Sequence, residues 1–147
     1  MTFNGIETMQ ILTQDECSEL LGAADVGRLA IAIENVPDIF PINYVMDRGT
    51  VVFRTAEGTK LAAAVLGRGV AFEIDGCDAA SGDAWSVVVK GAAVEIEKMY
   101  DLFDAQDLPL FPWHAGSKHR FVRIEPSEIT GRRFSVDPNV PAEHRRR

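Results

Sequence analysis

The fold is decided by residues 26–55, which read VGRLAIAIENVPDIFPINYVMDRGTVVFRT. Apolar residues alternate with small or polar residues in three runs, over 26–34, 39–47 and 50–55, and such alternation is typical of half-buried β-strands. We expect a turn at 35–38, and the Asp-Arg-Gly sequence before the third run is typical of a tight hairpin turn. Three strands joined by such short turns predict an antiparallel meander.

The rest of the chain continues this pattern. Gly91 interrupts a long apolar run and predicts a β-bulge or bend at that point. Thr13 and Glu16 have the spacing of a helix capping box. Strands are expected over 69–76 and 85–97, one or two closing strands over 118–136, and short helices over 14–22, 60–67 and 99–108.

These elements predict a mainly β fold, a six- to seven-stranded antiparallel split β-barrel with short helices between strands. The sequence shows no βαβ repeat of about 30 residues, which disfavours a doubly wound parallel sheet. Closing into a barrel also protects the edges of many short strands. The 147 residues fit one domain, which we expect over 1–137, followed by a polar tail over 138–147.

The composition argues against several functions. A net charge of −7 and a sequence pI of about 4.9 disfavour nucleic acid as a partner, because binding phosphate backbones requires a basic face. The N-terminus resembles no export signal, and no run reaches the ~18 apolar residues of a membrane span, so we expect a cytoplasmic protein. Cys17 and Cys77 lack CxxC spacing and are expected to be free thiols. His114 and His119 lack a third ligand at metal spacing, so no metal is expected.

Residues 53–64, FRTAEGTKLAAA, form a corner between the third strand and an alanine-rich segment. Arg54 offers a planar fork for phosphate oxygens, and Thr59 offers its N–H and hydroxyl groups. Lys60 adds a positive charge where a helix N-terminus is expected. The alternative is a solvated turn with two surface cations. The residues alone leave both interpretations open.

A second group contains Arg28, Pro41, Asn43 and Tyr44. Pro41 within a strand predicts an edge position or an irregularity, because proline cannot donate to the ladder. Asn43 and Tyr44 can line a planar ligand, since amide and phenol groups supply hydrogen bonds. The alternative is that Asn43 is a turn or cross-strand polar residue and Tyr44 belongs to the core.

A third group begins the long strand. Trp85 is either a packing anchor or the wall of a cofactor cleft with Ser86 as a hydrogen-bond donor. Trp113, in a Pro-flanked loop, either caps the core or marks a ligand or subunit boundary. Glu73 and Asp75 alternate with apolar residues, which indicates one solvated strand face rather than a paired-carboxylate site. GxSxG elbows, Cys/His/Asn patterns and Gly-rich dinucleotide fingerprints are absent from the sequence.

The order of these segments resembles the pyridoxamine 5′-phosphate oxidase-like, FMN-binding split-barrel superfamily, and more narrowly its nitroimidazole-resistance-type branch. The resemblance is carried by VGRLAIAIENVPDIFPINYVMDRGTVVFRTAEGTKLAAA, VAFEIDG, AWSVVVKGAAVEI and RIEPSEITGRRF, and covers about residues 12–135. It implies a homodimer of six-stranded split barrels with flavin at the dimer interface. The pyridoxal-phosphate-forming members carry a further C-terminal substrate segment, whereas this sequence ends soon after GRRF, so we do not expect pyridoxamine phosphate oxidation.

The resemblance also implies which residues surround the flavin. The family holds the flavin phosphate at its strand-turn-helix corner, runs the preceding strand beside the isoalloxazine ring, and places a Trp-Ser segment near the cofactor. The matching residues of this chain are Arg54, Thr55, Thr59 and Lys60 at the corner, Pro41, Ile42 and Asn43 on the strand, Trp85 and Ser86 on the long strand, and Trp113 from the partner subunit.

We therefore expect an FMN-binding oxidoreductase, a flavin reductase or oxidase that transfers hydride through flavin N5 to or from a small-molecule substrate. The spacing fixes no catalytic proton donor, and Tyr44 and His114 are the candidates. Two alternatives of other kinds stay open: a deazaflavin-dependent reductase, and a non-catalytic protein that binds flavin or haem. A barrel without cofactor, serving as an interaction module, is a third.

Overall fold

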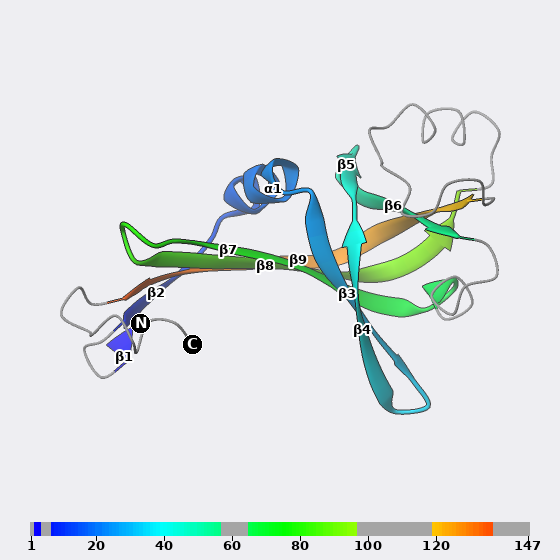
Figure 1. Cartoon of the computed structure of the whole chain (residues 1–147), viewed down its shortest axis with the longest axis horizontal. Helices are drawn as coiled ribbons and strands as arrows, with labels where there is room; N and C mark the ends of the chain where they lie inside the picture. Colours follow the sequence, from blue (N-terminus) through cyan, green and yellow to red (C-terminus); the bar gives the residue numbers. More distant parts are fainter. Residues whose placement is uncertain (1, 4–6, 57–64, 97–118, 137–147) are drawn as a thin grey trace.

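The computed structural model describes residues 2–3, 7–56, 65–96 and 119–136. Its strands pair antiparallel throughout and curl into a half-barrel sheet (Figure 1), which confirms the expected mainly β split barrel. The elements are β1 Thr2–Phe3, β2 Glu7–Ile11, α1 Gln14–Ala23, β3 Val26–Ile33, β4 Val36–Asn43, β5 Val45–Asp47, β6 Thr50–Ala56, β7 Gly69–Asp78, β8 Asp83–Glu95 and β9 His119–Val136.

Three expectations fall outside the described residues: the helix over 99–108, most of the helix over 60–67, and the tail over 138–147. Within the described ranges, no helix has the length and apolarity to cross a membrane. Both cysteines are free, as expected.

Helix α1 begins as the capping box predicts. The Glu16 N–H donates to the Thr13 hydroxyl at 3.1 Å, and the Thr13 N–H donates to Glu16 Oε1 at 2.9 Å. The helix buries Cys17 against β9, where a Cβ on Gly131 would lie only 2.6 Å from the Cys17 sulfur. The absence of a side chain at Gly131 therefore lets α1 pack directly on the sheet.

The first hairpin turn differs from the expectation. The turn expected at 35–38 lies at Glu34 and Asn35, whose φ angles are 50° and 66°, so β4 begins earlier, at Val36. Positive φ at both central positions belongs to the two-residue turn whose twist matches the flanking strands. The second turn, at Arg48 and Gly49, is confirmed and has the same sign of φ, at 50° and 78°.

The single strand expected over 39–47 is divided at Tyr44. The part before it, β4, pairs with β3, and the part after it, β5, pairs with β6. At the break, the Tyr44 N–H donates to the Asp25 carbonyl at 3.0 Å. Because one stretch of chain serves two partner strands, the sheet bends here.

Strand β9 holds the sheet together as one continuous strand, which resolves the choice between one and two closing strands. It pairs with β2, β8 and β6, and the main order of the sheet is β1-β2-β9-β8-β7-β3-β4. The register of β8 against β9 shifts between Lys90 and Gly91, which confirms the predicted bulge. Strands β1 and β2 were not expected from the sequence.

The concave face carries the core, and alternate residues of the same strands face outward. Its largest fully buried side chains include Phe53, Phe72, Leu21 and Leu29. A second, smaller cluster of Val52, Ile96 and Phe121 lies on the other face of β6. The candidate functional site lies on this second face of β6.

Candidate functional site

Arg54 lies on the outer face of β6, the face of the smaller apolar cluster. It stands opposite Phe121 of β9, and its guanidinium carbon lies 5.7 Å from the centre of the Phe121 ring. This distance is within the range of a cation–π contact. The ring therefore supports the cation at the end of the strand that leads into the corner.

Thr55, the next residue, faces the opposite way. It is 3% exposed, and alternation along β6 places it on the core face with Val51 and Phe53. Its hydroxyl oxygen has no hydrogen-bond partner among the described residues. The side chains of Arg54 and Thr55 therefore do not converge on one point, and Thr59 and Lys60 lie outside the described residues.

Asn43 ends β4, the strand that approaches β6 where the half-barrel closes. Strand β4 approaches β6, and the β5–β6 register pairs Val45 with Val52. Continuing that register by two residues sets Asn43 opposite Arg54 on the same face. The extended register thus sets the Asn43 amide on the same face as the Arg54 guanidinium and the Phe121 ring.

Strand β4, which carries Pro41 and Ile42, is an edge strand, as Pro41 predicted. Pro41 is exposed, whereas Ile42 is 4% exposed and packs in the core, so its side chain does not face a ligand. Pro37 and Pro41 have no N–H, and the N–H of Ile39 between them donates to the Asp38 carboxylate at 3.0 Å. At alternate positions this edge therefore offers no free donor to an incoming strand.

Tyr44 belongs to the core. Its hydroxyl donates to the Leu21 carbonyl at 2.5 Å, and its ring packs edge-on against Phe72 with 4.7 Å between centres. Burial, with a smaller contribution from the Asp25 carboxylate, raises the pKa of Tyr44 to about 12. Tyr44 is thus a packing residue, and the other candidate proton donor, His114, lies outside the described residues.

Trp85 and Ser86 lie on opposite faces at the start of β8. The Trp85 ring lies over Gly76 of β7, where a Cβ would approach it to 2.6 Å. Ser86 faces outward, between Asp75 and Arg132 in the sheet register. Trp85 is half-buried, which suits a packing anchor with one accessible side. Trp113 lies outside the described residues.

The two groups of predicted residues lie far apart within one chain. Phe121 stands opposite Arg54 on β9, and Arg133 stands opposite Trp85 on the same strand. Twelve residues separate these positions, which at about 3.3 Å per residue amounts to roughly 40 Å of strand. Figure 1 shows β6 and the β7–β8 turn at opposite ends of the molecule. One small ligand cannot touch both groups of the same chain.

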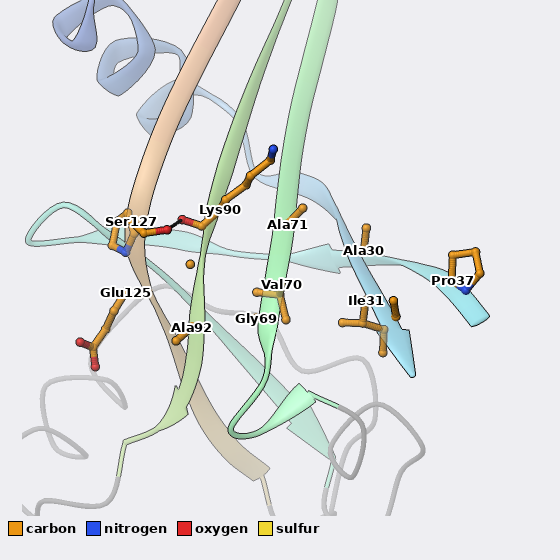
Figure 2. A pocket seen from close by; sticks show the side chains of 13 residues that line it. Ala30, Ile31, Pro37, Gly69, Val70, Ala71, Lys90, Ala92, Glu125 and Ser127 are labelled. Atoms are coloured by element: carbon orange, nitrogen blue, oxygen red, sulfur yellow. Dashed lines mark hydrogen bonds between the residues drawn. The ribbon is translucent and has the colours of Figure 1, made fainter. Parts of the chain in front are cut away.

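The outer face of the sheet holds a shallow hollow of about 900 Å³ between these two ends. Ala30, Ala71 and Ala92 lie along it and present only methyl groups, while Lys90 points away from its floor (Figure 2). Ile39, which stands opposite Ala30 on β4, is 64% exposed. The hollow therefore combines small apolar side chains with the polar groups of Lys90, Glu125 and Ser127.

Charged residues on this face form a cluster rather than a catalytic carboxylate pair. Arg28 Nη2 lies 2.5 Å from Glu73 Oε1 and 2.6 Å from Asp75 Oδ2. All three side chains are partly exposed, which agrees with the solvated strand face expected for Glu73 and Asp75. Arg28 is therefore engaged by its own sheet, although the sequence placed it among possible ligand contacts.

Phe121 is the site residue that the sequence did not indicate. It is one of several apolar residues in the closing strand, and nothing in its spacing sets it apart. Only the β6–β9 register shows that it supports Arg54.

Comparisons with known proteins agree on one family. The family model for pyridoxamine 5′-phosphate oxidase matches residues 13–133. The structure of an FAD-binding protein from Mycobacterium smegmatis is 44% identical, with 87% of this chain and 100% of that chain covered and a TM-score of 0.81. That of an FAD-binding protein from Mesorhizobium loti is 25% identical over 88% of this chain and 98% of that chain, with a TM-score of 0.68. An uncharacterized protein of Mycobacterium tuberculosis is 35% identical over 135 residues, 88% of each chain.

Proposed function

The chain belongs to the pyridoxamine 5′-phosphate oxidase family, and we propose that it is an oxidoreductase that binds a flavin nucleotide and exchanges hydride through flavin N5. The observation that carries this proposal is the Arg54 guanidinium against the Phe121 ring at the end of β6. Extending the β5–β6 register sets Asn43 opposite Arg54. A guanidinium fork suits a phosphate, and an amide suits the polar edge of the flavin ring.

The choice of flavin lies between FMN and FAD. The sequence resemblance favours FMN, whereas two similar solved structures are of FAD-binding proteins. FAD contains the whole of FMN, so the same cationic corner can hold the phosphate next to the riboflavin in either nucleotide. We propose FAD as the first ligand to test and FMN as the second.

We propose further that the flavin lies between two copies of this chain. The Arg54 corner and Trp85 are separated by roughly 40 Å of strand within one chain, so they can reach the same flavin only from different copies. The hollow at Ala30, Ala71 and Ala92 offers a face for the second copy. Because the prolines and Asp38 block pairing along β4, we expect the copies to pack by their faces rather than by joining sheets.

Mixing two defective variants tests this shared site. One variant carries Arg54→Ala and Lys60→Ala, and the other carries Trp85→Ala. In a random mixed population of dimers, half are heterodimers, and each heterodimer has one unaltered site. We expect remixing to restore about a quarter of the wild-type flavin sites. Binding no greater than the average of the two separate variants would show that Arg54 and Trp85 do not share a site.

A second candidate function is a flavin carrier or store without catalysis, favoured by the absence of a placed proton donor among the described residues. Anaerobic addition of NADPH or NADH to the flavin-loaded protein distinguishes the two. An oxidoreductase will transfer hydride from the nicotinamide to flavin N5, a proton from water will complete the reduced flavin, and the visible absorption will bleach. Admitting oxygen as the acceptor will restore the absorption. Flavin that stays oxidised with both nicotinamides would overturn the reductase proposal in favour of the carrier.

A further inference from the structure

The β3–β4 hairpin pairs with β7 through a short ladder, and its base continues through Tyr44 into β5, which pairs with β6. Only three pairs connect β3 to β7: Arg28 with Glu73, Leu29 with Phe72, and Ala30 with Ala71. Strand β7, by contrast, pairs with β8 along its whole length from Gly69 to Asp78. Figure 1 shows the hairpin projecting away from the body of the sheet. The short ladder makes the hairpin a natural hinge point.

One end of this ladder carries the Arg28 clasp, which consists of Arg28, Glu73 and Asp75. A single guanidinium nitrogen of Arg28 contacts a carboxylate oxygen from each acid, at 2.5 Å and 2.6 Å. In the register of β3 and β4, Arg28 stands opposite Pro41, two residues before Asn43. The clasp therefore connects β7 to the part of the hairpin that leads into the candidate site.

We propose that Arg28 is a positioning residue: held by Glu73 and Asp75, it fixes the β3–β4 hairpin against β7 and so sets where Asn43 stands beside Arg54. The effect on ligand binding rests on the proposed flavin site. The effect on the hairpin does not, because the clasp is formed by the chain alone.

The two acids have different roles in the clasp. A hydrogen bond with Glu73, followed by the contacts with Arg28, holds the pKa of Asp75 below its usual range although burial opposes this. Burial first, and the hydrogen bond with Asp75 second, raise the pKa of Glu73 although Arg28 opposes this. Asp75 is therefore the charged anchor of Arg28, and Glu73 is the acid that more readily carries a proton.

The surroundings of the clasp are mostly uncharged. The residues opposite it on the neighbouring strands are Pro41 on β4 and Ser86 and Val88 on β8. The next charged groups on this face are Lys90, two residues along β8, and Arg132, which stands opposite Ser86 on β9. The balance of charge within the clasp thus depends first on its own three members.

Hydrogen exchange in the flavin-free protein tests the clasp directly. In Arg28→Met, we expect amides of β3 and β4 to exchange about five- to tenfold faster, because the loss of two partly exposed ion pairs lowers the cost of local opening. Amides of β8 and β9 keep their wild-type rates. The control is Lys90→Met, which removes a cation from the same face, where Lys90 and Glu128 lie 4.0 Å apart. Unchanged exchange in Arg28→Met, or faster exchange throughout the sheet, would overturn the proposal.

Conservative variants show whether the charges of the clasp residues, rather than their packing, protect the hairpin amides from exchange. Arg28→Lys should restore part of the protection, because it keeps the positive charge. Asp75→Asn and Glu73→Gln should each loosen the hairpin, because Arg28 Nη2 contacts an oxygen of each acid, at 2.6 Å and 2.5 Å. Wild-type exchange rates in both acid variants would contradict the clasp.

The dependence on pH supplies a further readout. The folded chain holds the Glu73 proton more tightly than the unfolded chain does, so ionising Glu73 costs stability. The wild type therefore loses free energy of unfolding relative to Glu73→Gln as pH rises through the raised pKa of Glu73, and regains it as pH falls. Denaturant unfolding of both proteins at about pH 4 and about pH 7 measures this difference. If the wild type instead gained free energy of unfolding relative to Glu73→Gln as pH rises, folding would not raise the pKa of Glu73.

Flavin titration links the clasp to the site. We expect Arg28→Met to weaken FAD binding about five- to tenfold, with a changed visible spectrum of the bound flavin. Arg48→Met, at an exposed residue beyond the other end of β6, should bind FAD as the wild type does. A loosened hairpin with unchanged affinity and spectrum would overturn the positioning role. If the wild type itself binds neither FAD nor FMN, the proposed function fails, and hydrogen exchange still decides whether the clasp holds the hairpin.

Discussion

Replacing Arg54 and Lys60 together with alanine is expected to weaken flavin binding by about 100-fold or more, because each cation would give up charge-assisted hydrogen bonds to phosphate that are worth about 1.5–3 kcal/mol. Arg54 lies against the Phe121 ring on the outer face of β6 rather than in the main core. Its truncation therefore leaves the packing of the barrel largely intact. Fluorescence titration with FAD and FMN measures the loss, and denaturant unfolding checks the fold.

A matched control is available elsewhere on the chain. Arg48→Ala with Arg147→Ala changes the net charge by the same amount; Arg48 is 60% exposed at the other end of β6 from Arg54, and Arg147 lies far from the corner in sequence. This control should bind flavin as the wild type does. Equal losses of flavin binding in the two double variants would mean that only the overall charge matters. Unchanged flavin binding in the Arg54→Ala, Lys60→Ala variant would rule out a phosphate site at Arg54 and Lys60.

Replacing Gly91 with alanine is expected to lower the free energy of unfolding by about 3 kcal/mol or to prevent folding. A Cβ at this position would lie 2.1 Å from the carbonyl oxygen of Glu125 and 2.8 Å from its carbonyl carbon. These are backbone atoms of β9, so no flexible side chain can move aside. The bulge between Lys90 and Gly91 would have to open, and with it the longest pair of strands in the sheet.

Gly69→Ala is the control for Gly91→Ala. Gly69 lies in the neighbouring strand β7, and a Cβ there would meet nothing within 4 Å. We expect this variant to unfold within about 0.5 kcal/mol of the wild type. Chemical denaturation of both variants gives the comparison, and equal stability of Gly91→Ala and Gly69→Ala would show that β8 and β9 are not so closely packed at the bulge.

The strands were predictable where the signal is local. Alternation over 26–34 and 50–55 marked β3 and β6, and a lone glycine in an apolar run marked the bulge at Gly91. The division of one expected strand at Tyr44 was not predictable, because it depends on contacts with Asp25 and Leu21 rather than on neighbouring residues. Similarly, β2 gains its strand structure from pairing with β9, more than a hundred residues away.

The candidate site was predictable in part. The sequence singled out Asn43 and Arg54, and the register brings them to one face. It grouped Thr55 with Arg54, although adjacent strand residues point to opposite faces. Sequence spacing also says nothing of the distance between Arg54 and Trp85, which follows from where each strand meets β9.

Titration of the purified wild-type protein with FAD and with FMN, followed by flavin fluorescence, tests most directly whether this chain binds a flavin nucleotide. We expect saturable binding of one flavin per chain, with a Kd of about 1 μM or tighter for at least one nucleotide, and loss of that binding in the Arg54→Ala, Lys60→Ala variant. Failure of both nucleotides to bind at about a hundred times that concentration would contradict this expectation.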